Sequence, residues 1–213
     1  MLSNFPSESF FDLPRFAYKD IFQNIGNAWE SLSFISSYIN SLFEKGIIKG
    51  NFNGREDIFV GEGATIHKGA EIIGPAIIGR NCVVDHASLI RGGCVIGDNC
   101  RIGHAVEVKH AIFLNDVSAS HLSYVGDSIV GNGVNISGGT IIANYRLDKK
   151  TVTVKYKNKK IDTGLLKFGS IIGDGTRIGV NSVLNPGTII GKNCLIYPLH
   201  SISGVYEENS IIK

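Results

Sequence analysis

A six-residue spacing of aliphatic residues runs through most of this 213-residue chain and limits the folds open to it. The series runs unbroken from Val60 to Val108, resumes after single-residue slips at Phe113 and Val130, and returns at Ile172. All 21 of its positions are apolar, and 19 of them are Val, Ile or Leu. A period this short indicates a solenoid of stacked coils, in which each coil buries its apolar residues on the next.

A small residue stands two positions before most of the aliphatic ones. This second series comprises Ala64, Ala70, Ala76, Cys82, Ser88, Cys94, Cys100, Ser170, Thr176, Ser182, Thr188 and Cys194. Residues two apart on a strand face the same way, so one large and one small side chain would fill a narrow interior together. These features resemble the hexapeptide repeat of the left-handed parallel β-helix, in which three hexapeptides form one triangular coil. We therefore expect an all-β fold of about seven coils.

The cysteines follow the same packing register. All four, Cys82, Cys94, Cys100 and Cys194, belong to the small series. A disulfide framework or a zinc site would not keep to that register, so we expect reduced thiols in the core and no bound metal. Reduced thiols are typical of a cytoplasmic protein.

The composition excludes several classes of protein. Hydrophobic residues make up 43% of the chain and its net charge is only +2, so disorder and bulk binding to nucleic acid or a membrane surface are not indicated. The apolar runs are too short to span a bilayer, and the N-terminus shows no signal peptide. We expect a soluble cytoplasmic protein whose partners include neither nucleic acid nor a membrane.

Two segments depart from the repeat, so we divide the chain into residues 1–50 and 51–213. In the first, Trp29, Leu32, Ile35, Ile39 and Leu42 follow helical spacing, which predicts a mainly helical appendage packed on the β-helix or on a neighbouring subunit. Docking of another partner is the alternative. A capping box of Asn27 and Glu30 would start this helix, and Gly46 would stop it.

The second departure is an excursion over residues 144–168. Alternation from Thr151 to Tyr156, a turn at residues 157–160 and a resumption at Ile161 predict a β-hairpin. Its excess of lysines could bind a phosphorylated ligand, although a solvated hairpin tip explains the same residues.

Two cations occupy equivalent positions one coil apart. Arg91 and Lys109 are 18 residues apart, and each directly follows an aliphatic position, so we expect them to stack about 5 Å apart on one edge. Two like charges that close favour an anion between them, which suggests a phosphate site. Neutralisation by the nearby Glu107 is the alternative.

Three histidines also share an equivalent position. His86, His104 and His121 lie 18 and 17 residues apart, which would suit a zinc site on a β-helix. The chain lacks the close His-x4-His pair of the hexapeptide-repeat carbonic anhydrases, however, so we predict no metal site.

Longer motifs make the resemblance more specific. They are Val106-Glu107-Val108-Lys109-His110-Ala111, His121-Leu122-Ser123-Tyr124-Val125-Gly126-Asp127 and Val134-Asn135-Ile136 through Ala143-Asn144-Tyr145. Together they resemble the acetyltransferase half of the bifunctional glucosamine-1-phosphate acetyltransferase and N-acetylglucosamine-1-phosphate uridyltransferase, over roughly residues 60–200. The hairpin and Lys167-Phe168-Gly169 resemble shorter sugar-1-phosphate nucleotidyltransferase relatives of archaea and bacteria.

The resemblance implies a role for each matching residue. His121 matches the general base that deprotonates the sugar amine, and an imidazole suits that task near neutral pH. The matches to substrate-binding positions are Arg91 and Lys109 for the sugar phosphate, Tyr124 and Asn135 for the sugar, Asn144 for the amine, and Tyr145 beside it. The resemblance further implies a homotrimer with sites between its subunits. Acetyl-CoA, the co-substrate, would lie along the triangular prism that the stacked coils form.

The chain also departs from the family. The 213 residues contain no match to the uridyltransferase half with its nucleotide loop, nor to the basic C-terminal tail. Val180 replaces a serine at a CoA-contacting position, and Tyr197-Pro198 replaces a small pair. No residue is therefore assigned to CoA binding.

These observations leave three hypotheses about function. The first is an acyl-CoA-dependent N-acetyltransferase acting on an amino-sugar phosphate such as glucosamine 1-phosphate, a step in UDP-N-acetylglucosamine biosynthesis. The second is an acyltransferase acting on a nucleotide-linked amino sugar. The third is a non-catalytic, sugar-phosphate-binding assembly subunit that has lost CoA binding.

Overall fold

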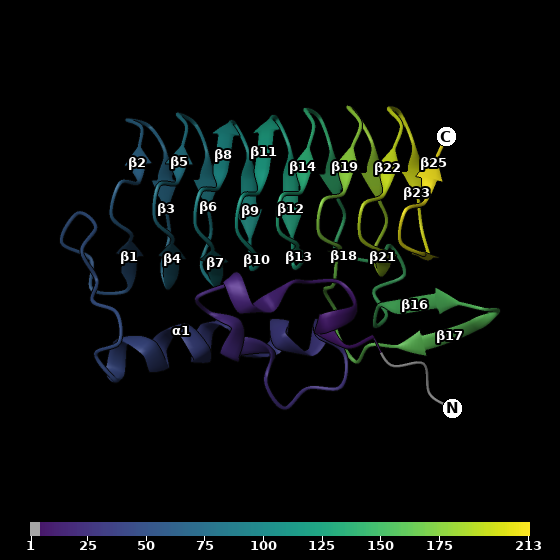
Figure 1. Cartoon of the computed structure of the whole chain (residues 1–213), viewed down its shortest axis with the longest axis horizontal. Helices are drawn as coiled ribbons and strands as arrows, with labels where there is room; N and C mark the ends of the chain where they lie inside the picture. The colour runs from purple at the N-terminus through teal and green to yellow at the C-terminus, as the bar shows by residue number, and fades with distance from the viewer. Residues whose placement is uncertain (1–4) are drawn as a thin grey trace.

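The computed structural model describes residues 5–213 and has the architecture that the repeat predicts, a parallel β-helix with three sheets (Figure 1). The first sheet contains β1 (Ile58–Val60), β4 (Ala76–Ile78), β7 (Cys94–Ile96), β10 (Ile112–Phe113), β13 (Ile129–Val130), β18 (Ser170–Ile172), β21 (Thr188–Ile190) and β24 (Val205–Tyr206). The second contains β2 (Thr65–Ile66), β5 (Val83–Val84), β8 (Arg101–His104), β11 (Ser118–His121), β14 (Asn135–Ile136), β19 (Arg177–Ile178), β22 (Leu195–Ile196) and β25 (Ile211–Ile212). The third contains β3 (Glu71–Ile72), β6 (Leu89–Ile90), β9 (Glu107–Lys109), β12 (Tyr124–Gly126), β15 (Ile141–Ile142), β20 (Val183–Leu184) and β23 (Ser201–Ile202).

Each coil pairs in parallel register with the next, so equivalent residues lie directly above one another. Ile78 pairs with Ile96, and Ile96 pairs with Phe113 across the first predicted slip. The aliphatic series forms a continuous interior, with the cysteines and other small residues between its members. All four cysteines are buried and free, as predicted. Burial raises the pKa of the Cys94 thiol to about 12, which keeps it protonated and inert.

The coil count is slightly larger than predicted. The two eight-stranded sheets and the seven-stranded third sheet amount to seven full coils and two sides of an eighth. Tyr206 and Ile212 continue the interior beyond Ile202. The six-residue count missed them because the step from Ile202 to Tyr206 is only four residues long.

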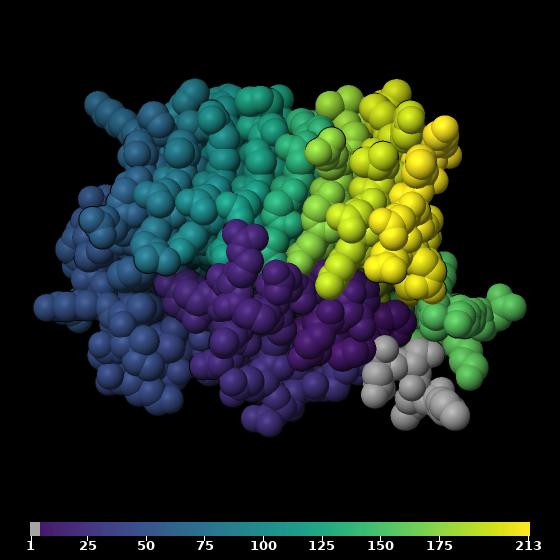
Figure 2. All heavy atoms as spheres, viewed as in Figure 1, coloured from purple at the N-terminus to yellow at the C-terminus, as the bar shows by residue number. Residues whose placement is uncertain are grey.

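The N-terminal segment covers the outer face of the first sheet (Figures 1 and 2). Its elements are the 3₁₀ helices η1 (Ser7–Ser9), η2 (Leu13–Arg15), η3 (Lys19–Phe22) and η4 (Ala28–Phe34) and the α-helix α1 (Ile35–Glu44). The five apolar residues predicted to follow helical spacing are all buried. The capping box of Asn27 and Glu30 is present, but it opens the 3₁₀ helix η4 rather than an α-helix. The α-helix α1 follows directly and ends just before Gly46. Residues 1–4 of the predicted appendage lie outside the described residues.

A second apolar core joins this segment to the β-helix. Trp29 packs against Phe168, with ring centroids 5.9 Å apart, and is only 2% exposed. On six of the eight strands of the first sheet, the residue next to the inward position points outward into this core and is fully buried: Ile77, Val95, Ile112, Ile129, Ile171 and Ile189. On the two end strands, Phe59 and Val205 hold this position and are partly buried. The six-residue series did not reveal this set, because the set recurs only once per coil.

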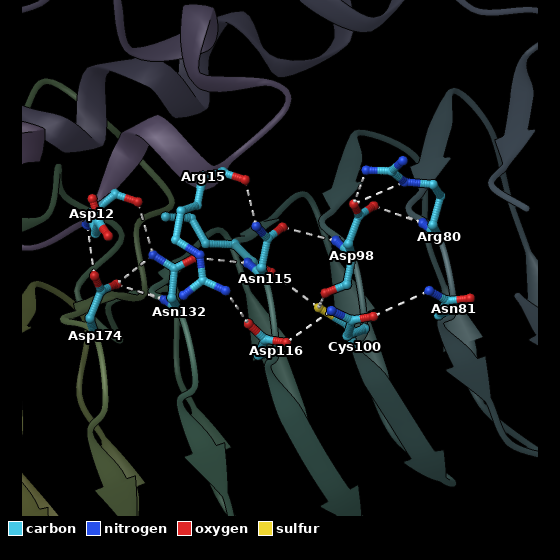
Figure 3. Close-up of polar contacts among 12 residues, drawn as sticks. Asp12, Arg15, Arg80, Asn81, Asp98, Cys100, Asn115, Asp116, Asn132 and Asp174 are labelled. Atoms are coloured by element: carbon cyan, nitrogen blue, oxygen red, sulfur yellow. Dashed lines mark hydrogen bonds and ion pairs between the residues drawn. The ribbon is translucent and has the colours of Figure 1, made fainter. Parts of the chain in front are cut away.

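Polar contacts fix the same segment along the corner between the first and second sheets (Figure 3). The Asp174 carboxylate accepts hydrogen bonds from the backbone N–H groups of Asp12 at 2.7 Å and Asn132 at 2.6 Å. The Asn115 side chain donates to the carbonyl oxygen of Arg15 at 2.7 Å. The covering segment is therefore held by the backbone as well as by apolar packing.

The excursion contains a hairpin of β16 (Thr153–Tyr156) and β17 (Lys159–Asp162), which projects from the prism (Figure 1). The prediction of a hairpin is confirmed, but the turn is shorter than expected. Lys157 and Asn158 both have positive φ and close it alone, since two such residues suffice for a tight hairpin turn. Across residues 5–213, no helix is both long and apolar enough to cross a membrane.

Candidate functional site

Polar residues gather where the chain passes from the third sheet to the first, which we call the third-to-first corner. Two of its turns are one residue short, because the interval between inward residues falls from six to five at Phe113 and at Val130. His110 and Asp127 make these tight turns, with φ of 49° and 43°. The two slips in the sequence therefore mark the turns that hold the polar cluster.

Asp127 is the centre of this cluster. Its carboxylate accepts hydrogen bonds from Lys109 Nζ at 2.9 Å, from His110 Nδ1 at 3.1 Å and from Asn144 Nδ2. Asn144 Nδ2 also lies 3.1 Å from the Tyr124 hydroxyl. Three of the predicted substrate-binding residues, Lys109, Tyr124 and Asn144, are thus connected through a residue that the prediction did not include.

Glycine at position 126 makes this arrangement possible. A Cβ atom there would come within 2.5 Å of the Tyr124 hydroxyl oxygen and 2.6 Å of Asn144 Nδ2. A side chain at this position would displace the Tyr124 phenol and the Asn144 amide from their present places, because real Cβ atoms essentially never approach other atoms so closely.

The cluster shifts the pKa values of its members. Burial acts to raise the pKa of Asp127, but hydrogen bonds from His110, Lys109 and Asn144 outweigh it and lower that pKa. Burial, reinforced by the negative charge of Asp127, raises the pKa of Tyr124. At neutral pH the corner therefore holds an ionised carboxylate beside a protonated phenol.

Arg91 and Lys109 lie one coil apart, yet each has its own carboxylate. Arg91 forms an ion pair of 3.0 Å with Glu107, and Lys109 forms one of 2.9 Å with Asp127. For Arg91 the structure therefore shows the predicted alternative, in which Glu107 neutralises the cation. Arg91 and Lys109 therefore do not require an anion between them, because a carboxylate already neutralises each of them.

Tyr145 and Lys167 complete the third-to-first corner. Their backbones pair in an antiparallel bridge, which brings Lys167 beside Asn144. Tyr145 is 45% exposed and lines an open groove of about 740 Å³ between the base of the hairpin and the later coils. Lys167 is a third cation on the segments that form this corner, besides Arg91 and Lys109.

His121 lies at the opposite edge of the third sheet, in the corner between the second and third sheets. Its backbone pairs with that of His104, and the rings of His104 and His86 are 4.3 Å apart, so the predicted equivalence of the three histidines is confirmed. The His121 side chain is exposed, and no hydrogen bond to its imidazole is found in the described part of the chain. Among residues 5–213, no group of three or more His, Cys, Asp or Glu side chains could hold a metal ion.

The predicted site residues therefore fall into two groups. Arg91, Lys109, Tyr124, Asn144 and Tyr145 lie at or beside the third-to-first corner. The other two, His121 and Asn135, lie apart from this corner. Asn135 is on the second sheet, where it pairs with Ser118 of the strand that ends at His121. The three-residue strand β12 separates the two edges by about 10 Å.

Sequence reasoning missed Asp127, His110 and Lys167 as members of the site. A signal for Asp127 was present, because it stands 18 residues after Lys109 and beside the shortened turn. Lys167 gave no such signal, since the hairpin excursion separates it from Tyr145 by 22 residues of sequence.

The comparisons with known proteins agree with this fold. The family model of the GMPPB C-terminal domain matches residues 72–159, and that of the bacterial transferase hexapeptide (six repeats) matches residues 169–198. The chain is therefore a hexapeptide-repeat protein. It is 37% identical to the bifunctional protein GlmU of Methanococcus maripaludis over 191 residues, which are 89% of this chain and 46% of that protein.

Two further proteins are similar over part of the chain. A bifunctional sugar-1-phosphate nucleotidylyltransferase/acetyltransferase of Sulfurisphaera tokodaii is 42% identical over 93 residues, 44% of this chain and 23% of that protein. The crystal structure of AntD, an N-acyltransferase from Bacillus cereus, has a TM-score of 0.39 at 19% identity and covers 71% of this chain and 76% of that chain. The predicted resemblance to sugar-1-phosphate nucleotidyltransferase/acetyltransferases is confirmed, although this chain spans less than half the length of the GlmU relative.

Proposed function

We propose that this protein is an acyl-CoA-dependent N-acetyltransferase that acts on an amino-sugar phosphate such as glucosamine 1-phosphate. The observation that carries this proposal is the connected network of Lys109, Tyr124, Asp127 and Asn144 at the third-to-first corner. A connected network of partly buried polar groups with a shifted carboxyl pKa is typical of a binding site. The relatives named above, bifunctional nucleotidyltransferase/acetyltransferases and GlmU proteins, support the same reaction class.

The charges and hydrogen-bonding groups of this corner suit such an acceptor. Lys109 has two further N–H donors for a phosphate beyond the one given to Asp127. Lys167, whose backbone pairs with that of Tyr145, adds a third cation to this region, which favours an anionic ligand. Tyr145 offers a partly exposed ring against which a sugar can pack.

His121 is the proposed general base. As the amine nitrogen attacks the thioester carbonyl carbon, the imidazole accepts a proton from that nitrogen, the carbon–sulfur bond breaks, and the sulfur leaves as a thiolate that takes up a proton. The products are an N-acetylated sugar phosphate and free CoA. An imidazole suits this exchange because its charge changes near neutral pH.

The proposal places three copies of the chain around each other. Within one chain His121 and the third-to-first corner lie at opposite edges of a sheet, so a neighbouring copy can bring the two groups together. The edge that carries His121 is also apolar: Leu122 is 63% exposed and Leu199 is 76% exposed. Val180 and Pro198 lie on the same edge, where acetyl-CoA would run in this arrangement. The buried free thiols fit a reducing cytoplasm.

One observation favours a second acceptor, a nucleotide-linked amino sugar. The groove of about 740 Å³ begins at Tyr145, is also lined by Arg146 and Lys155, and is larger than a sugar phosphate alone requires. Lys155 could pair with a diphosphate, and the fully exposed Leu147 could pack against a base.

A thiol-release assay tests these alternatives. Purified protein would be incubated with acetyl-CoA and either glucosamine 1-phosphate or a UDP-linked amino sugar, with His121→Ala as control. His121-dependent release with glucosamine 1-phosphate supports the proposal, and release only with the nucleotide-linked sugar supports the second candidate. No release and no calorimetric binding of acetyl-CoA would refute both and leave a non-catalytic sugar-phosphate-binding subunit.

A further inference from the structure

Among residues 5–213, Asp127 is the only buried charged residue, with 5% of its surface exposed. Removing a carboxylate from water is costly unless several donors compensate. Asp127 has three side-chain donors: the Lys109 ammonium group, a ring nitrogen of His110 and the Asn144 amide.

The fold itself does not require a carboxylate here. Gly93, His110 and Asp127 stand at the same turn position in successive coils, all with positive φ. Glycine and histidine make this turn as well as aspartate does, and asparagine tolerates the same backbone region. The carboxylate is therefore explained by the groups it holds rather than by the turn.

The carboxylate also decides which way the Asn144 amide faces. A carboxylate with a lowered pKa only accepts hydrogen bonds, so the NH₂ end of Asn144 must face Asp127. The same NH₂ group donates to the Tyr124 hydroxyl oxygen at 3.1 Å. Asn144 Oδ1 is then left to accept from a ligand, and the Tyr124 hydroxyl hydrogen is left to donate to one.

We propose that Asp127 is a positioning residue that sets the hydrogen-bonding pattern of the acceptor site before the substrate binds. It fixes Lys109 as a donor to the phosphate, Tyr124 as a donor to a sugar oxygen, and Asn144 as the acceptor of an amine N–H. This inference rests on the proposed function. It adds that the donor–acceptor pattern that receives the amine originates in a residue that does not touch the substrate.

The kinetic test compares Asp127→Asn with a matched control, Asp98→Asn. Asp98 also holds a cation one coil away, Arg80 at 2.9 Å, but at the corner between the first and second sheets (Figure 3). We expect Asp127→Asn to lower kcat/KM for glucosamine 1-phosphate by about 10²-fold, because a misplaced positioning group costs that much. KM for acetyl-CoA should change by less than about threefold, and Asp98→Asn should leave both values unchanged, as expected for a surface pair.

Two kinetic results would overturn the proposal. Unchanged acceptor kinetics in Asp127→Asn would show that the carboxylate positions nothing. Tighter acceptor binding would show that Asp127 acts only as a counter-charge to Lys109, since its removal adds one positive charge to the corner.

A second measurement does not depend on activity. In NMR spectra of ¹⁵N-labelled protein, the Asn144 side-chain amide should exchange slowly in the wild type and in Asp98→Asn, and faster in Asp127→Asn. Equal exchange in all three would overturn the proposal even if the enzyme were active. If the wild type acetylates no amino-sugar phosphate, the proposed function fails, and this amide signal alone decides whether Asp127 positions Asn144.

Discussion

The first and third sheets share one inward pattern but have different outer faces. On the six inner strands of the first sheet the outward residues are aliphatic and covered, and Ile112 is not exposed at all. On the third sheet the equivalent residues include Glu107, Tyr124 and Ile141, which remain partly or largely accessible. The inward residue thus specifies the coil, and its outward neighbour decides whether a face is covered or stays accessible to solvent.

The covered face is stabilised by burial that the open face lacks. Each fully buried Ile or Val on the first sheet contributes about 1.5–3 kcal/mol before conformational entropy is subtracted. The third-to-first corner instead contains a buried ion pair, which stabilises little and is costly to break. We therefore expect substitutions on the two faces to separate stability from activity.

The largest effect is expected from His121→Ala at the edge of the open face. Loss of a general base lowers kcat/KM by about 10²- to 10⁴-fold. The side chain is exposed, so the urea midpoint of unfolding should not change. Wild-type kinetics in this variant would show that His121 is not the general base.

The next effect compares one residue type on the two faces. Ile112→Ala on the covered sheet should reduce the free energy of unfolding by about 2–5 kcal/mol, because it leaves a cavity between sheet and covering segment. Ile141→Ala, at a 38% exposed position of the third sheet, should cost less than about 0.5 kcal/mol. If urea titrations gave similar losses in the free energy of unfolding for the two variants, the first sheet would not be stabilised by its covering segment as described.

A smaller effect is expected from Asp174→Asn, where the covering segment meets the coils (Figure 3). The amide oxygen can still accept from Asp12 or Asn132, but the hydrogen bonds lose their charge assistance. We expect a loss of about 1–2 kcal/mol in the free energy of unfolding, with unchanged acetyl transfer. A fall in activity without a fall in stability would instead connect the covering segment to catalysis.

The smallest effect concerns pH. The pKa of Asp127 is lowered in the folded chain, so its contribution to stability is present above the ordinary carboxyl pKa near 3.8 and is lost as the pH falls through the lowered value. Between pH 7 and pH 3 the free energy of unfolding should therefore fall less in Asp127→Asn than in the wild type. An equal or steeper fall in the variant, measured by urea titration at both pH values, would contradict this assignment.

The prism could be predicted from the sequence because its inward residues repeat at a fixed short interval and local register carries them into one core. The third-to-first corner was predictable only in part. Lys109 follows an inward position, so its edge was known, but its pairing with Asp127 depends on which way two side chains turn. Tyr145 and Lys167 meet only after the hairpin returns, and no periodic pattern records that contact.

The assignment of chemistry to the open face is tested most directly by hydrogen exchange. Protein with and without saturating glucosamine 1-phosphate and CoA would be compared by mass spectrometry of its peptides. We predict slower exchange in peptides covering residues 104–127 and 135–145, and no change in residues 5–44. Protection of the covering segment, or no protection at all, would contradict this division between a face that stabilises the fold and a face that binds substrate.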